Sequence, residues 1–310
     1  MIIRQKAFEG ASKMQKVQLH SHTTRSDGKM SPKELLYAYA EENFDLVAIT
    51  DHRIYNRNNF APETGVEIIP GMEIDAKFDI TAGGMRHLHT LVLGVDDDAN
   101  GYAQDERVKS AELDDPMEFQ SMLDEAHAKN NLTVYCHPEW SRTPARYFED
   151  LEGNFAMEIW NSGSAIKHDM DMNAPYWNEI MAHGRKWFGV ATDDTHDRNT
   201  LGRGYVMVNA EKNAASVLNA LKEGAFYSST GPIIKDFYFD TDENTVYVKT
   251  TGVSKVWLIR DRQADTLIGD SGAGLVLEAS HKMSVHPEML RVCVVDANGR
   301  RAWTNPIFLD

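Results

Sequence analysis

The stretch VQLHSHTTRSDGKMSPKELL (residues 17–36) decides the fold of the first half of this chain. An apolar segment runs into His20 and His22, and Asp27 follows in a turn-forming RSDG segment. Alternate residues of an extended chain point to the same side, so His20 and His22 can face one metal ion together. The turn can bring Asp27 back to the same place. The stretch therefore predicts a short strand that ends in a cluster of metal-competent side chains.

A helix signature follows this loop directly. Ser31 fits the N-cap, Pro32 the first helical position and Glu34 the capping-box position. Farther along, apolar strand-like segments alternate with helical or loop segments, at residues 45–50, 66–70, 87–93, 132–136, 155–160, 187–192 and 205–208. Such alternation favours parallel strands covered on both sides, and seven or eight of them close into a barrel.

Further His, Asp and Glu clusters stand where other expected strands end. They are Asp51-His52, Glu73, His137-Pro138 and Asp193-Asp194-Thr195-His196, with His87 and His89 between the second and third. The carboxyl ends of barrel strands converge on one rim, so we expect these side chains to meet there. A mixed nitrogen and oxygen donor set without thiolates suits zinc, manganese or iron. The pattern predicts two or three divalent ions, with a carboxylate such as Glu73 bridging two of them.

The pattern of apolar and turn-forming residues changes at Pro232. Short strand-like runs, separated mostly by turn residues, replace the helical periodicity. We therefore expect an α/β domain over residues 1–231 and a small antiparallel β-sandwich over residues 232–310.

Composition excludes several classes of protein. The chain has 310 residues, is 42% hydrophobic and carries a net charge of −15, which argues against a basic surface for nucleic acid or anionic membranes. Its two cysteines, Cys136 and Cys293, imply no disulfide framework, and Cys136 is interpreted as a core residue. Without a signal-peptide or transmembrane pattern we expect a cytoplasmic protein, with a trimmed export signal as the alternative. The sequence predicts no oligomeric state.

The motifs LHSHTTRSDG (19–28), ITDH (49–52), PGMEID (70–75), CHP (136–138) and TDDTH (192–196) resemble those of the polymerase-and-histidinol-phosphatase (PHP) superfamily of metal-dependent phosphoesterases. The resemblance covers about residues 15–231. The segment SSTGPIIKDFYF (228–239) is similar to a subgroup in which a small β-domain follows. The resemblance implies a distorted, TIM-like (β/α)₇ barrel with a trinuclear metal site at its rim.

The resemblance also implies which residues hold the metal ions. The implied ligands are His20, His22, Asp27, His52, Glu73, His89, His137, Asp194 and His196. Two of these positions have rivals in the sequence: His87 is the alternative to His89, and Asp193 is the alternative to Asp194. The Asp-x-His spacing favours Asp194.

The leading functional hypothesis is a phosphoesterase that hydrolyses a small phosphate ester with a hydroxide activated by a di- or trinuclear metal site. Among the ligands, His22, Glu73 and His196 are predicted to act directly in catalysis. Four residues in rim loops or at strand ends are predicted to contact the substrate: Arg25, Arg53, Arg203 and Asn161. Two alternatives stay open. One is a metal-dependent hydrolase of carboxylic or carbamate esters or amides, and the other is a degenerate barrel that acts as a binding module.

Overall fold

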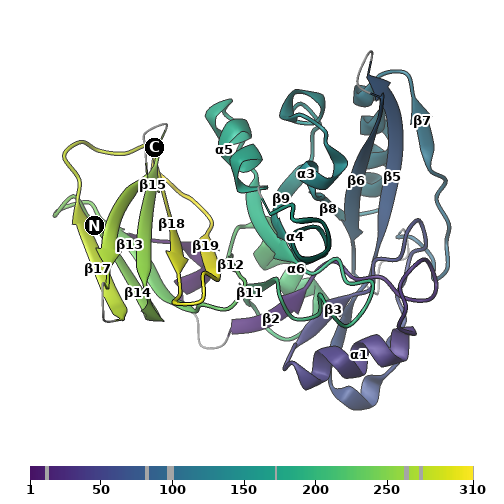
Figure 1. Cartoon of the computed structure of the whole chain (residues 1–310), viewed down its shortest axis with the longest axis horizontal. Coiled ribbons are helices and arrows are strands. Elements are labelled where there is room, and N and C mark those ends of the chain that lie inside the picture. The colour runs from purple at the N-terminus through teal and green to yellow at the C-terminus, as the bar shows by residue number, and fades with distance from the viewer. Residues whose placement is uncertain are drawn as a thin grey trace.

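The computed structural model of the chain describes residues 1–10, 14–80, 84–95, 101–171, 173–261, 265–271 and 275–309. It has a part built from helices and strands and a part built from strands, which lie side by side in Figure 1. Both chain ends lie in the all-strand part. The predicted site residues lie in the helix-containing part, which is therefore described first.

Three short parallel strands begin the helix-containing part: β2 (Met14–Gln18), β3 (Leu46–Ala48) and β4 (Glu67–Ile69). Helix α1 (Pro32–Glu41) connects β2 to β3. The predicted capping box is confirmed, because the Ser31 side chain accepts a hydrogen bond from the Glu34 backbone while the Glu34 carboxylate accepts one from the Ser31 backbone. Residues 19–30 thus form a loop between two well-defined ends.

A six-stranded sheet faces this first group. Its order is β10 (Phe188–Thr192), β9 (Asn154–Asn161), β8 (Leu132–Tyr135), β6 (Gly84–Leu93), β5 (Gly71–Ile80) and β7 (Ala111–Leu113). The expectation of parallel strands throughout is wrong at β6, which runs antiparallel to both β5 and β8. The reason is the connection: only residues 81–83 separate β5 from β6, and a parallel crossover needs about a dozen residues.

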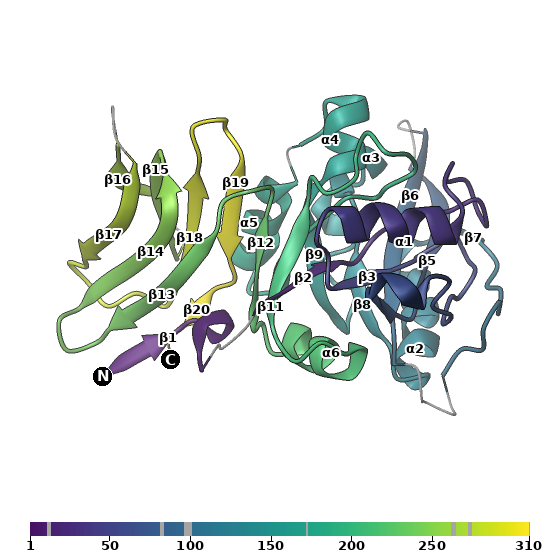
Figure 2. The same ribbon diagram turned by 90° about the horizontal axis from the view of Figure 1, so that it is seen from below.

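The two groups of strands share one hydrophobic core. Val17, Leu46 and Ile69 from the first group are buried in one cluster with Leu91 and Val190 from the second. The other helices of this part are α2 (Gln120–Ala128), α3 (Pro138–Ser141), α4 (Ser162–His168), α5 (Ala174–Ala182) and α6 (Ala214–Lys222). Figure 2 shows α1, α2 and α6 around the strands. The structure is therefore an α/β domain with an antiparallel β-sheet region beside it.

The antiparallel region consists of two sheets that share a core. One sheet contains β1 (Ile2–Arg4), β13 (Ile234–Asp240), β14 (Thr245–Val253) and β17 (Val276–Lys282). The other contains β16 (Thr266–Asp270), β15 (Lys255–Arg260), β18 (Met289–Val295) and β19 (Arg301–Thr304), with β20 (Ile307–Phe308) paired to β18. Phe237 and Val246 of the first sheet pack with Leu258 and Val292 of the second.

Strand pairing crosses the predicted boundary between residues 231 and 232. Strand β19 pairs with β12 (Phe226–Ser229), β12 with β11 (Tyr205–Asn209), and β11 with β2. The N-terminal strand β1 pairs with β13 on the far side of the boundary. The division into domains at 231 stays a prediction. Within the described ranges, no helix is long and apolar enough to cross a membrane.

Candidate metal centre

The first and last sequence motifs lie side by side where their strands end. Ser21 and Thr195 form an isolated parallel bridge, the His22 backbone N–H donates to Thr195 at 2.8 Å, and the Asp194 N–H donates to the His20 carbonyl at 3.0 Å. A second parallel bridge joins His52 to Glu73. Backbone pairing thereby brings together motifs that are distant in the sequence.

The Glu73 carboxylate lies at the centre of the cluster and is 1% exposed. One oxygen, Oε2, is 3.0 Å from His52 Nδ1, 3.3 Å from His22 Nε2 and 3.5 Å from His20 Nε2. The other, Oε1, is 2.8 Å from His89 Nδ1 and 3.2 Å from His137 Nε2. Both oxygens therefore face imidazole nitrogens, so that either can share a cation with a histidine.

The Asp194 carboxylate is a second point on which histidine nitrogens converge. Its Oδ1 is 3.2 Å from His22 Nε2, 3.4 Å from His20 Nε2 and 3.5 Å from His196 Nδ1. Asp194 has a φ of 49°, and the predicted ligand His137 has a φ of 25°. Both values lie in the left-handed region that non-glycine residues seldom adopt, and such strain is concentrated at functional sites.

Asp27 closes the cluster on the solvent side, with 53% of its side chain exposed. Its oxygens lie 3.6 Å from His22 Nδ1, 3.6 Å from His52 Nε2 and 3.3 Å from His196 Nε2. Asp51 shapes the loop that carries it, because its carboxylate accepts hydrogen bonds from Thr23 and Ser26. The structure thus brings all nine predicted ligands into one contiguous cluster.

The two histidines on β6 have different surroundings. His89 lies within hydrogen-bonding distance of Glu73, and it is 7% exposed. His87 is half-buried at the outer part of the strand, and its ring centroid is 5.9 Å from that of His89 and 6.2 Å from that of Trp140. The geometry therefore favours His89 over His87 as the residue that reaches the cluster.

Asp193 and Asp194 point to different places. The Asp193 carboxylate accepts backbone hydrogen bonds from Gly202 at 2.6 Å, Arg203 at 2.8 Å and Gly204 at 2.8 Å, and a further bond from the Tyr39 hydroxyl at 3.1 Å. Burial raises the pKa of Asp193 to about 6, although these backbone N–H groups oppose the shift. Asp193 therefore fastens the loop 202–204, while Asp194 faces the histidines.

The carboxylates and imidazoles of the cluster shift one another's pKa values. Burial alone would lower the pKa of His22, but hydrogen bonds to Asp194 and Glu73 raise it to about 9. The pKa of His20 is likewise well above its usual range, because Asp194, Glu73 and Glu158 outweigh the effect of burial. Burial would raise the pKa of Glu73, but His52, His89 and His20 hold it well below its usual range. The carboxylates of the cluster therefore need cations, which are either protons on the histidines or metal ions.

The metal-free protein is expected to lose stability as the pH rises from about 6.5 to 9. The pKa of His22 is about 9 in the folded chain against about 6.5 in an unfolded one, so its charged form stabilises the fold fully below pH 6.5 and loses that effect as pH rises through 9. For His22 alone the loss is at most about 3–4 kcal/mol. Thermal unfolding of chelator-treated protein at pH 6 and pH 9 measures it.

Metal should reverse this trend, because metal ligands must be deprotonated and affinity therefore grows with pH. Unfolding in the presence of zinc across the same pH range is the control. A melting temperature of the chelator-treated protein that stays constant or rises between pH 6 and pH 9 would contradict the expected coupling.

The residues present fit a metal group. His52 Nδ1 and Asp194 Oδ1 are buried and make no well-aligned hydrogen bond within the described residues, although Glu73 and His22 lie 3.0 and 3.2 Å from them. His20 Nε2 and His22 Nε2 face each other at 3.1 Å. Groups of three or four ligand atoms lie within 4.8 Å of one another, among them His22-Asp27-His52-His196, His20-His22-Glu73, His20-His137-Asp194 and His52-Glu73-His89. Converging lone pairs of nitrogen and oxygen are the donor set that zinc, manganese and iron take.

The cluster opens into a cavity of about 280 Å³. Besides predicted ligands it is lined by residues that sequence reasoning missed, namely Trp140, Gly163, Ser164, Lys167 and His168. The Trp140 ring lies 5.1 Å from that of His137, and Lys167 Nζ lies 3.1 Å from Asp197. The sequence contained one signal for four of these five residues. Residues 162–168 come directly after the strand that ends at Asn161, so they could be expected near the other strand ends.

The predicted substrate-contacting residues are not among those that line this opening. Arg25 is paired with Asp105, and Arg53 is paired with Asp75. Arg203 borders a different, smaller pocket, and none of the three is among the described residues that line the metal-side cavity. Asn161 is fully buried, where its amide donates to Glu158 at 2.8 Å and to Asp194 at 3.1 Å. Their contact with substrate stays a prediction.

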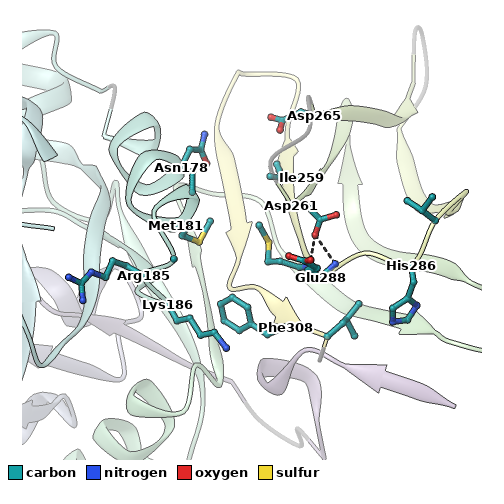
Figure 3. Close-up of a pocket in the computed structure, with 15 residues that line it drawn as sticks. Asn178, Met181, Arg185, Lys186, Ile259, Asp261, Asp265, His286, Glu288 and Phe308 are labelled. Atoms are coloured by element: carbon teal, nitrogen blue, oxygen red, sulfur yellow. Dashed lines mark hydrogen bonds between the residues drawn. The ribbon is translucent and has the colours of Figure 1, made fainter. Parts of the chain in front are cut away.

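A larger cavity of about 1180 Å³ lies elsewhere, between α5 and the antiparallel strands (Figure 3). Met181 and Lys186 line it on one side, and Asp261, Glu288 and Phe308 on the other. Asp261 accepts hydrogen bonds from the backbone of Glu288 and Met289, so its carboxylate is already engaged. None of the predicted metal ligands lines this cavity.

Comparisons with known proteins agree with the site. The family model described as "PHP domain" matches residues 18–161. A 5'-3' exoribonuclease of Haemophilus influenzae is 35% identical over 68 residues, which are 21% of this chain and 25% of that protein. A PolC-type DNA polymerase III of Oceanobacillus iheyensis is 21% identical over 256 residues, which are 72% of this chain and 15% of that protein. The chain thus spans a quarter or less of the length of either relative.

Two solved structures are also similar. A two-domain protein of Bacteroides vulgatus, described as containing a predicted PHP-like metal-dependent phosphoesterase, is 13% identical, with 97% of this chain and 96% of that chain covered and a TM-score of 0.48. An amidohydrolase of Chromobacterium violaceum with bound sulfate and no metal is 13% identical, with 59% and 88% covered and a TM-score of 0.41.

Residues 18–161 are therefore similar to the PHP domain, and the buried His/Glu/Asp clusters lie within this stretch and shortly after it. The matched residues 18–161 contain seven of the nine predicted ligands, and Asp194 and His196 follow outside the match.

Proposed function

We propose that this protein hydrolyses a small phosphate ester at the cluster around Glu73. The observation that carries the proposal is the Glu73 carboxylate, which lies within 3.5 Å of nitrogen atoms of five histidines. Divalent ions bound there would supply a nucleophilic water at neutral pH and offset the charge of a phosphate group. We also infer that the parallel strands β2, β3 and β4 and the six-stranded sheet together form a distorted (β/α)₇ barrel. The Ser21–Thr195 and His52–Glu73 bridges join the ends of these two groups of strands.

The predicted ligands fall into a buried group and a more exposed group, and we infer a different role for each. His20, His22, Glu73, His89 and His137 form the buried floor, and they would hold ions and exclude bulk water. Asp27, His52 and His196 form the more exposed side, through which substrate and product would pass. Lys167 lines the cavity wall beside Asp197, and we infer that its ammonium attracts an anionic substrate. His168 also lines the cavity and could protonate the leaving oxygen.

A small substrate is favoured over a polymer. The two curated relatives are named as nucleic-acid enzymes, yet this chain covers a quarter or less of each of them. Its net charge of −15 opposes a polyanion, and its cavity of about 280 Å³ suits a small molecule.

His22→Ala is expected to reduce both bound metal and phosphatase activity, because His22 Nε2 lies between Glu73 and Asp194. The measurement is metal content per chain together with turnover of a panel of phosphate esters by wild type and variant. The panel is extended with carboxylic esters, amides and short RNA and DNA oligonucleotides, which are assayed in the same way. His281→Ala, outside the cluster, is the matched control.

Each outcome of that panel is informative. Fewer than two ions per chain in the wild type, or unchanged activity in His22→Ala, would contradict the proposal. Turnover of carboxylic esters or amides without phosphate esters would support the alternative hydrolase. Turnover confined to oligonucleotides would contradict the small substrate while leaving the metal centre in place.

A further inference from the structure

Glu158 is a fully buried carboxylate beneath the candidate metal centre. Its Oε1 lies 2.7 Å from His20 Nδ1 and accepts a hydrogen bond from the Thr192 hydroxyl at 2.5 Å. Its Oε2 accepts from the His137 backbone N–H at 2.9 Å and from the Asn161 amide at 2.8 Å. These four groups stand at or just after the ends of β2, β8, β9 and β10.

The number of donors argues against Glu158 as a ligand. A carboxylate offers about four lone-pair directions, and four neighbouring groups already occupy them. His20, Cys136 and Glu158 do place candidate ligand atoms within 4.8 Å of one another. Yet His20 turns its Nδ1 toward Glu158 and its Nε2 toward Glu73 and Asp194, at 3.5 and 3.4 Å. The ion-facing side of His20 is therefore the side opposite Glu158.

We propose that Glu158 is the positioning residue of the metal centre. It keeps the His20 proton on Nδ1, so that the Nε2 lone pair points at the position between Glu73 and Asp194. The inference rests on the proposed function only in requiring that the cluster binds metal. A metal-ligating histidine that donates its other ring N–H to a carboxylate is held in orientation and tautomer, and losing such a partner costs 10–100-fold in affinity.

Glu158 also acts on two other predicted ligands. Its bond to the His137 backbone N–H restrains a residue with a φ of 25°, which the chain would otherwise relax. Its bond to Asn161 fixes the amide that donates to Asp194 Oδ2 at 3.1 Å. One side chain thereby sets the orientation of His20, the backbone of His137 and, through Asn161, the carboxylate of Asp194.

Glu158→Gln tests this role with little change of shape. If the new amide nitrogen faces His20, Nδ1 must accept a hydrogen bond and the proton moves to Nε2, where it blocks metal. If the nitrogen faces His137 and Asn161 instead, its N–H groups point at the His137 backbone N–H and the Asn161 amide, and no hydrogen bond can form. We expect zinc affinity, measured by chelator competition, to fall about 10–100-fold. Glu179→Gln makes the same change of charge at an exposed position of α5 and should bind zinc like wild type.

A second measurement uses the unaltered protein. In ¹⁵N-histidine NMR spectra of the zinc-loaded wild type, His20 should carry its proton on Nδ1. Zinc affinity unchanged in Glu158→Gln, or a His20 without a proton on Nδ1, would overturn the proposal. Neither readout uses a phosphate ester. A protein that shows both effects but hydrolyses no phosphate ester would therefore refute the proposed function and leave the role of Glu158 supported.

Discussion

Glu73→Gln should leave the chain unable to hold its full complement of metal ions and should lower phosphatase kcat/KM at least about 100-fold, since even a residue that merely supports a ligand costs 10–100-fold when lost. The physical reason is the number of partners. Both Glu73 oxygens face imidazole nitrogens, including His52 Nδ1 at 3.0 Å and His89 Nδ1 at 2.8 Å. A glutamine keeps one acceptor oxygen and turns an NH₂ group toward the remaining histidines.

Metal content per chain and steady-state kinetics measure this loss. Glu67→Gln removes a carboxylate from an exposed position on β4 and should leave both quantities unchanged. A Glu73→Gln protein that retains the metal content and kcat/KM of wild type would show that this carboxylate does not hold the ions.

Asp193→Asn and Asp194→Asn should separate stability from metal binding at adjacent residues. Asp193 accepts hydrogen bonds from the backbone of Gly202, Arg203 and Gly204, and an asparagine NH₂ would face at least one of these donors. Leaving a buried donor unpaired next to a formerly charged group should destabilise Asp193→Asn by about 2–4 kcal/mol. Its metal content should match wild type. Asp194→Asn should instead lose metal, because Asp194 Oδ1 faces His20 and His22.

Denaturant unfolding measured at pH 7.5, together with metal content, distinguishes the pair. Each variant serves as the control for the other, because the change of charge and shape is the same. Loss of metal from Asp193→Asn at full stability would mean that the ligand had been assigned to the wrong aspartate.

The sequence was sufficient to predict much of the cluster, because most of its ligands lie beside the ends of strand segments. His20 and His22 follow β2, Glu73 lies at the start of β5, and Asp194 follows β10. The capping box at Ser31 was predictable for a similar reason, since Ser31 and Glu34 are neighbours in the chain. Local patterns suffice where the chemistry is local.

Other features depend on distant pairing. The antiparallel direction of β6 was missed because a strand's own pattern does not contain the direction of its neighbours. Trp140 and Lys167 line the cavity because of where α3 and α4 pack, and the only sequence signal for Lys167 was its position after the strand that ends at Asn161. The four partners of Glu158 come from segments up to 138 residues away in the chain, so only the fold brings them together.

The pairing of β1 with β13 has a consequence for how the chain folds. Residues 2–4 are synthesised long before their partner strand, which consists of residues 234–240. Closing so long a loop before other contacts form is entropically unfavourable, and chains dominated by such non-local contacts fold slowly. The α/β part can acquire its core before residues 234–240 are made, but β1 can pair only after they exist. Strand β1 thus waits for its partner while the segments between the two strands fold.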